Sequence, residues 1–452
     1  MQENREYVGW WWLPEDPARQ VPGELSYDPS KGLFLKLNGI FEEDPNSVPS
    51  YYRIVLGKSH RGDPLTLYNC FVTRVGVPSR GYPISTYYIG VAFVGYHFNK
   101  PEDIRFSNLT VRFEYLEEWL GFHVFHYEHG LDEKLTITYK KPEPIKMEFD
   151  LFDIRINYYL EYTMGDGWRE GRMSSQAYLS IDLKNDLSLD DAYYIINHLR
   201  NFITLGIGKP IGILEFEGRT RNLEEHKRIE ILFQKPQYIG DQPRINPWDM
   251  VFPFNSISKN PKYFLDNWLG KVNRLEPIYD LFFATLYIPN LFPVHEFLSL
   301  AQTIEAYHSR TFSNNILPVD NFKRLREDIA GKIDKLSKEY RSHFYARLDY
   351  MNEKTLRSRL IELLTKYDFL IKGFGYNIEG LANQVVDARN YYTHYSDALK
   401  DRAVDIKDLP ILAQKLRFIL LGILLNEIGF NEEQIIACVY RYKNRSEIRR
   451  VI

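Results

Sequence analysis

The stretch that determines the fold of the C-terminal half is EFLSLAQTIEAY, residues 296–307. Its apolar side chains recur at intervals of three and four, at Phe297, Leu300, Ala301 and Ile304. This spacing places them on one stripe of an α-helix. The same period continues along the chain and predicts helices over residues 263–288, 294–309, 319–348, 353–371, 377–392, 408–427 and 431–439. We therefore expect an all-α domain over residues 263–452.

The first 252 residues have a different period. Residues 32–37 and 135–139 are rich in alternating or β-branched side chains, and glycine and proline turns separate such segments. One helix is expected here, from about Ser188 to Phe202, because acidic residues occupy what would be its first turn. Residues 238–262 are rich in Pro, Asn and Ser and have no period. We expect a β-rich domain over residues 1–252 and, with the helical domain, an α+β protein.

The number of cysteines and the length of the apolar runs indicate in which cellular compartment the protein is expected. The chain has 452 residues and two cysteines, Cys70 and Cys438, which are too far apart in sequence to suggest a disulfide framework or a zinc site. The longest apolar run, residues 418–425, has about eight residues, too few for a signal peptide or a membrane span. We expect a cytoplasmic protein without membrane contact.

Charge is distributed unevenly along the chain. The net charge of −3 argues against a protein coated in positive charge. Residues 261–452 contain 28 basic and 24 acidic side chains, whereas the first 260 residues contain 29 and 36. This mild C-terminal excess of basic residues permits RNA binding there.

A second stretch, VVDARNYYTHY at residues 385–395, contains side chains that suit catalysis. It places Arg389 and His394 five residues apart, with Asn390 directly after the arginine. Cleaving RNA without a metal ion requires a group that takes the proton of the 2′-hydroxyl, a group that protonates the leaving oxygen, and a cation for the phosphorane. Histidine suits the first two roles because its pKa lies near neutral pH. The planar guanidinium of arginine suits the third.

The spacing of this pair constrains its geometry. Five residues separate Arg389 and His394 by about 140° on an ideal helix. Asn390 and His394, four residues apart, share a face. Either the helix ends or bends before His394, or Arg389 and His394 meet across a dimer interface where two copies of the helix oppose each other.

The string alone is weakly specific. Similar pairs occur elsewhere, at Arg53 with His60, Arg219 with His226, and Arg221-Asn222 with His226. These pairs lie in the β-rich region, whereas Arg389 follows the apolar positions Leu381, Val385 and Val386 of an expected helix. The alternative interpretation of that segment is a solvated arginine and histidine at a helix end.

Two other features suggest sites that we discount. His123, His126 and His129 recur at intervals of three, but in a strand His126 would face away from the other two, which disfavours a metal site. The three tryptophans at residues 10–12 could stack on a nucleobase, but burial in a strand is the expected arrangement. We expect no metal ion and no cofactor.

The C-terminal region resembles the HEPN domain, specifically its ApeA-like branch, a bundle of four to five helices that carries R-x4-6-H with a polar residue after the arginine. Arg389, Asn390 and His394 match this motif position by position. An earlier helix of the branch resembles LAQTIEAYH at residues 300–308, where Glu305 matches the acidic residue that supports the catalytic arginine. The resemblance implies a ribonuclease core over about residues 294–440.

The N-terminal part is similar to the ApeA N-terminal domain, through GWWWLP (residues 9–14), VPGEL (21–25), LKLNGIF (35–41) and GDPLTLYNC (62–70). Together the two similarities imply a bacterial anti-phage abortive-infection protein. Its helical domain would form a homodimer or higher homo-oligomer and cleave host RNA, with tRNA the expected substrate. Its N-terminal domain would be a sensor or regulatory domain that restrains the nuclease until a phage-derived trigger binds.

The primary hypothesis is a metal-independent endoribonuclease whose 2′-hydroxyl attack leaves a 2′,3′-cyclic phosphate and a 5′-hydroxyl. His394 would act as general base or acid and Arg389 would stabilise the phosphorane, while Asn390 and Glu305 would orient them. The alternative is a non-catalytic HEPN-type module that dimerises or binds RNA.

Overall fold

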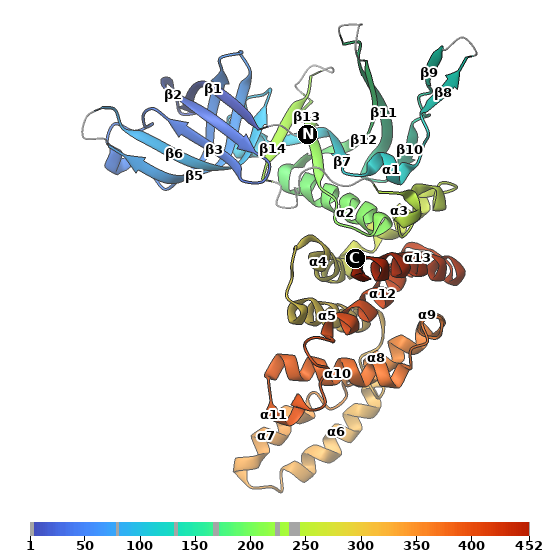
Figure 1. Ribbon diagram of the computed structural model, residues 1–452. Coiled ribbons are helices and arrows are strands. Elements are labelled where there is room, and N and C mark those ends of the chain that lie inside the picture. Colours follow the sequence, from blue (N-terminus) through green and yellow to red (C-terminus); the bar gives the residue numbers. More distant parts are fainter. Residues whose placement is uncertain are drawn as a thin grey trace. The chain divides into compact units, whose positions relative to one another are not determined.

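Two compact units make up the chain, Met1–Lys262 and Tyr263–Ile452. The computed structural model describes residues 4–77, 81–130, 134–165, 171–221, 227–234 and 245–451. The first unit is rich in strands and the second is helical (Figure 1). The prediction of an α+β protein with an N-terminal β-rich part is therefore confirmed.

A closed β-barrel forms the first part of the strand-rich unit. Its strands follow the order β6-β3-β2-β1-β4-β5, and β5 pairs back onto β6 in antiparallel register. They are β1 (Arg5–Leu13), β2 (Asp16–Asp28), β3 (Gly32–Leu37), β4 (Tyr51–Ser59), β5 (Pro64–Gly76) and β6 (Ile84–Val94). The core inside this ring of strands includes the fully buried Trp11, Leu25, Leu35, Leu67 and Ile89.

The three consecutive tryptophans have different environments on β1, because neighbouring side chains of a strand face opposite sides. Trp11 is fully buried. Its ring lies over Gly57 of β4, where a Cβ atom would come within 2.2 Å of the indole. Trp10 is 52% exposed. The predicted burial is confirmed for Trp11 and wrong for Trp10.

The sheet continues from β6 into an open part with the order β14-β13-β7-β12-β11-β10. These strands are β7 (Arg105–Phe113), β10 (Ile145–Glu148), β11 (Phe152–Thr163), β12 (Arg172–Ser188), β13 (Ile213–Arg219) and β14 (Ile229–Phe233). A separate two-stranded sheet pairs β8 (Phe125–His129) with β9 (Leu135–Tyr139). The short helix α1 (Leu116–Leu120) follows β7.

Helix α2 (Leu189–Ile207) follows β12 directly and packs against β7 and β12. Ser188 starts the helix because its hydroxyl accepts the N–H of Asp191 at 3.2 Å. Gly208 ends it in the left-handed conformation, with a φ of 75°. The helix predicted from Ser188 to Phe202 is therefore present and extends about one turn further.

Apart from an isolated β-bridge between Asn315 and Glu353, the described elements of the second unit are helices. They are α3 (Pro261–Gly270, which begins at the end of the first unit), α4 (Val272–Tyr287), α5 (Pro293–Thr311), α6 (Val319–Ile333), α7 (Lys338–Leu348), α8 (Leu356–Lys366), α9 (Asp368–Gly373), α10 (Ile378–His394), α11 (Asp397–Lys400), α12 (Leu409–Ile428) and α13 (Glu432–Val451). Helix α5 packs against α4, α8, α10 and α12, so it lies at the centre of the contacts (Figure 1).

Three of the helices predicted as continuous are divided in the structure. The prediction over residues 263–288 corresponds to α3 and α4, that over 319–348 to α6 and α7, and that over 353–371 to α8 and α9. Ser337 separates α6 from α7 because its backbone is extended, with ψ at 149°. Apolar spacing persists across such short breaks, so the period alone could not locate them.

Helix α12 is long and apolar enough to cross a membrane by length and composition. About two thirds of its apolar window, 67%, is nevertheless buried inside the protein. Its side chains are buried on all sides, including Leu416, Ile419, Leu420, Ile423 and Leu424. This burial is typical of the core helix of a bundle.

Candidate functional site on helices α5, α8 and α10

Helix α10 carries three of the four residues predicted to act in catalysis. Asn377 starts the helix because its side chain accepts the N–H of Gly380 at 2.7 Å. The buried side chains then recur at helical intervals, at Leu381, Ala382, Val385, Ala388 and Tyr392. Arg389 and Asn390 lie beside this buried stripe and stay partly exposed.

Arg389 forms an ion pair with Glu305 of α5. Nη2 of Arg389 lies 3.6 Å from Oε2 of Glu305, and Nη1 donates a 3.4 Å hydrogen bond to Oδ1 of Asn390. The Arg389 and Glu305 side chains are 35% and 30% exposed. Three residues predicted from the sequence therefore lie together, and the Arg389 side chain stays partly exposed to solvent.

His394 is the last residue of α10 and is exposed. The helix ends only after it, where Tyr395 adopts a φ of 49° and donates its N–H to the carbonyl of Tyr391. The helix therefore does not end before His394. In a regular helix this spacing places Arg389 and His394 about 140° apart. Among the residues that the structure describes, the His394 side chain has no hydrogen bond, ion pair or ring contact.

Three tyrosines surround the end of α10. Ring centroids of Tyr391 and Tyr392 lie 5.0 Å apart, and those of Tyr391 and Tyr395 lie 5.6 Å apart. Tyr395 is 61% exposed and directly follows His394. Exposed aromatic rings of this kind can stack on an unpaired base.

Arg359 of α8 is a functional candidate that the sequence analysis missed. Its Nη1 lies 3.8 Å from Oε1 of Glu305, so this carboxylate is shared by two guanidinium groups. One sequence signal could have indicated it. Arg359 lies three residues after Leu356 and four before Leu363, which places a charge on the apolar stripe of a helix, where it requires a partner.

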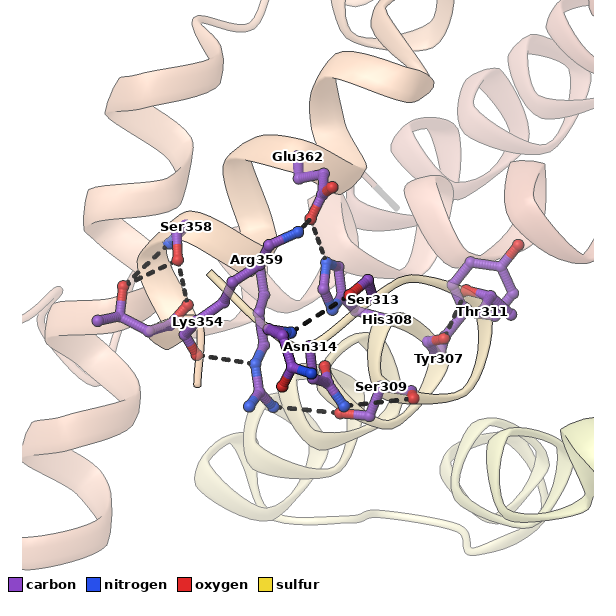
Figure 2. A network of polar contacts seen from close by, with 12 residues as sticks. Tyr307, His308, Ser309, Thr311, Ser313, Asn314, Lys354, Ser358, Arg359 and Glu362 are labelled. Atoms are coloured by element: carbon purple, nitrogen blue, oxygen red, sulfur yellow. Dashed lines mark hydrogen bonds and ion pairs between the residues drawn. The ribbon is translucent and has the colours of Figure 1, made fainter. Parts of the chain in front are cut away.

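The surroundings of Arg359 form a connected polar network (Figure 2). Its Nε donates to the carbonyl of Lys354 at 2.9 Å, and Nη1 donates to Oγ of Ser309 at 3.1 Å. In the same network the buried His308 lies 2.8 Å from Glu362 through Nε2, and Lys354 reaches the same carboxylate at 2.6 Å. The hydrogen bonds from Lys354 and His308 hold the pKa of Glu362 below its ordinary value.

Other sequence features do not form comparable sites. No group of three or more His, Cys, Asp or Glu residues that could hold a metal ion occurs in the described part of the chain. His123, His126 and His129 are exposed on or beside β8. The R-N-x3-H string in the β-rich region begins at Arg221, which forms an ion pair with Asp186 at 2.7 Å. Its other two members, Asn222 and His226, lie outside the described residues.

The arrangement on α5 and α10 can bind an anion and transfer a proton. An arginine side chain that is about a third exposed can exchange water for phosphate oxygens, and its guanidinium can form two parallel hydrogen bonds with them. An exposed imidazole can give or take a proton near neutral pH. The acidic partner on α5 limits the orientations that the guanidinium adopts.

Residues 298–434, which make up most of this helical bundle, match the family model of the Apea-like HEPN domain. HEPN domains are in general ribonucleases, and they typically bind RNA and dimerise. Residues 6–268, more than half of the chain, match the family model of ApeA N-terminal domain 1. The chain therefore belongs to the ApeA family of HEPN nuclease-type defence proteins. Searches of the curated proteins and of the solved structures found no match.

Proposed function

We propose that the chain is a metal-independent endoribonuclease in which Arg389 and His394 are catalytic. The observation that carries the proposal is the ion pair between Arg389 and Glu305, which holds a partly exposed guanidinium on the helix that ends with an exposed imidazole. Membership in the ApeA family supports RNA as the substrate. The exposed ring of Tyr395 adds a surface on which a base can stack.

In the proposed reaction the ribose 2′-oxygen attacks the adjacent phosphorus. His394 takes the 2′-hydroxyl proton as general base, and a general acid gives a proton to the 5′-oxygen as its bond to phosphorus breaks. Arg389 binds the oxygens of the phosphorane and stabilises their charge. Asn390 and Glu305 orient the guanidinium. The products are a 2′,3′-cyclic phosphate and a 5′-hydroxyl.

The helix geometry favours an active site built from two copies of the chain. On a regular helix the five-residue spacing places Arg389 and His394 about 140° apart, which supports a site in which a second copy supplies one of the two groups at a given phosphodiester. We propose a homodimer or higher homo-oligomer formed through the helical domain, residues 263–452, with the HEPN core over about residues 294–440. A second copy of His394 would then be the general acid.

We propose that residues 1–252 sense infection and restrain the nuclease until a phage-derived component binds. The nuclease would then cleave host tRNA in the cytoplasm and stop the growth of the infected cell. Removing residues 1–250 should give a constitutively toxic fragment. A folded fragment that leaves growth unchanged would argue against restraint.

Incubating the purified chain with total tRNA and excess EDTA tests the chemistry. Cleavage that persists under chelation, with fragments that carry cyclic phosphate ends, is the expected result. Cleavage that stops with EDTA and returns with a divalent cation would exclude the metal-independent mechanism.

A second candidate function is a HEPN-type module that dimerises or binds RNA without cutting it. The observation in its favour is that the guanidinium of Arg389 already has a carboxylate partner, as in a structural ion pair. Stable RNA binding without any cleavage in the same assay would support this function.

A further inference from the structure

We propose that Arg359 is a positioning residue of this site, which compensates the charge of Glu305 and so leaves Arg389 free to bind the phosphate. The inference rests on the proposed ribonuclease function. It assigns different roles to the two arginines that share one carboxylate, the first as a fixed counter-charge and the second as the group that contacts RNA.

Arg359 is held in place from several directions. Its Nε and Nη1 donate to the Lys354 carbonyl and the Ser309 hydroxyl (Figure 2). Its Nη2 lies 3.5 Å from Glu353. Only 12% of its side chain is exposed. A phosphate would have to displace most of these contacts to reach it, so Arg359 is poorly placed to bind RNA itself.

Arg389 is much less restrained. Its guanidinium contacts Glu305 at 3.6 Å and Asn390 at 3.4 Å, both long for charge-assisted contacts, and its side chain is 35% exposed. Of the two cations on Glu305, Arg389 is therefore the one that can turn toward a ligand without breaking a tight network.

The half-buried carboxylate of Glu305 requires a cationic partner. If Arg389 were the only cation beside Glu305, turning toward a phosphate would leave the carboxylate unpaired in a partly desolvated place, which is unfavourable. Because Arg359 stays 3.8 Å away, Glu305 keeps a partner when Arg389 leaves. Without Arg359, Glu305 would attract Arg389 more exclusively and compete with the RNA.

This role predicts that the effect of Glu305 on activity reverses sign. With Arg359 present, Glu305→Gln should slow cleavage, because Glu305 orients Arg389. With Arg359→Gln, the uncompensated carboxylate should hold Arg389 back, and adding Glu305→Gln should then speed cleavage. A purely structural role of Arg359 gives no such reversal, since a second loss of packing would lower activity further.

The experiment measures kcat/KM for tRNA cleavage by the full chain as wild type, E305Q, R359Q, R359Q/E305Q and H394A. We expect R359Q to lose about tenfold, the size seen for coupled charged neighbours, and R359Q/E305Q to recover at least threefold of that loss. Arg357→Gln is the matched control, because Arg357 lies on the same helix but bonds to Asn383. It should cleave as wild type does.

The possible results distinguish a failure of the proposed ribonuclease function from a failure of the role proposed for Arg359. Full activity in H394A would overturn the proposed function itself. Loss of activity in H394A together with wild-type cleavage by R359Q, or with a double variant slower than R359Q, would overturn only the role of Arg359. If R359Q does not fold, as judged by circular dichroism, R359M and R359M/E305Q replace it, because methionine removes the charge but keeps a long, unbranched side chain that can pack in the same place. The double variant should again be the faster of the two.

Discussion

Two carboxylates in contact with the α5 region have opposite surroundings. Glu427 of α12 accepts the hydroxyl of Tyr307 at 2.6 Å and pairs with Lys271 at 2.8 Å and with Arg274 at 3.0 Å, and its side chain is 13% exposed. Glu305 of α5 has two guanidinium partners at 3.6 and 3.8 Å and is 30% exposed. One carboxylate is fully satisfied by short contacts, whereas the other is shared through long ones.

This difference indicates which charges stabilise the fold and which are available to a ligand. Short hydrogen bonds in a desolvated place add stability and resist rearrangement. Long, partly exposed ion pairs contribute little to stability and exchange readily with solvent or a ligand. Glu427 therefore joins the end of α12 to α4 and α5, while the Glu305 cluster keeps a cation available at the surface.

The largest expected effect is on RNA cleavage, at the partly exposed site around Glu305. Arg389→Ala and His394→Ala should each lower RNA cleavage about a thousandfold or more, because they remove the phosphorane cation and the proton-transfer group. Both side chains are at least partly exposed, so the free energy of unfolding should change by less than about 1 kcal/mol. Single-turnover cleavage of labelled tRNA and urea titration measure the two quantities.

Thr393→Ala is a control for these variants, because within the described part of the chain its hydroxyl bonds only to the carbonyl of Arg389, at 2.7 Å. It should cleave RNA at nearly the wild-type rate. Wild-type cleavage by both Arg389→Ala and His394→Ala would place the active site elsewhere.

The next effect concerns stability. Glu427→Ala should lower the free energy of unfolding of the helical unit by about 2 kcal/mol, since it leaves the Tyr307 hydroxyl and two cations without their acceptor. Glu305→Ala should lower it by less than about 1 kcal/mol, because its ion pairs are long and partly exposed. Equilibrium urea unfolding compares the two variants directly. Equal losses would contradict the distinction between the two carboxylates.

The smallest effect is a pH dependence. Burial opposes ionisation of Glu427, but the hydrogen bonds from Lys271 and Tyr307 outweigh it and hold its pKa below the ordinary value of 4.5. A lowered pKa in the folded state adds stability above pH 4.5, and this stability disappears as the pH falls through the folded-state pKa. The difference in unfolding free energy between wild type and Glu427→Gln should therefore shrink below pH 4.5. A difference that stays constant from pH 7 to pH 3 would show that the charge of Glu427 does not stabilise the fold.

Periodicity predicted the elements of this fold better than their connections. The three-and-four spacing in residues 296–307 predicted α5, and acidic residues after Ser188 predicted the start of α2. The barrel closure was not predictable, because it requires β1 to pair with β4 and β3 to pair with β6, and local spacing does not specify pairings between strands that are not consecutive in sequence. The exposure of Trp10 depends on the same sheet geometry.

In the candidate site, too, the sequence predicted individual residues better than the contacts between distant segments. The motif and the family resemblance led to Arg389, Asn390 and Glu305, which the structure brings together. The partnership of Arg359 with Glu305 links α8 to α5 across 54 positions of sequence, and nothing local in either helix specifies it. The structure also shows that α10 continues through His394, which helix periodicity alone could not decide because helix ends depend on capping.

Strand β6 belongs both to the barrel and to the open part of the sheet. One of its edges pairs with β5, while the other pairs with β3 over residues 85–89 and with β14 over residues 91–94. Arg5 of β1 also reaches Glu230 of β14 with two contacts of 2.5 and 2.6 Å. A truncation or a recombination event that removes β14 would leave the backbone groups at the end of β6 without hydrogen-bond partners. The barrel and the open part of the sheet should therefore fold together and be inherited together.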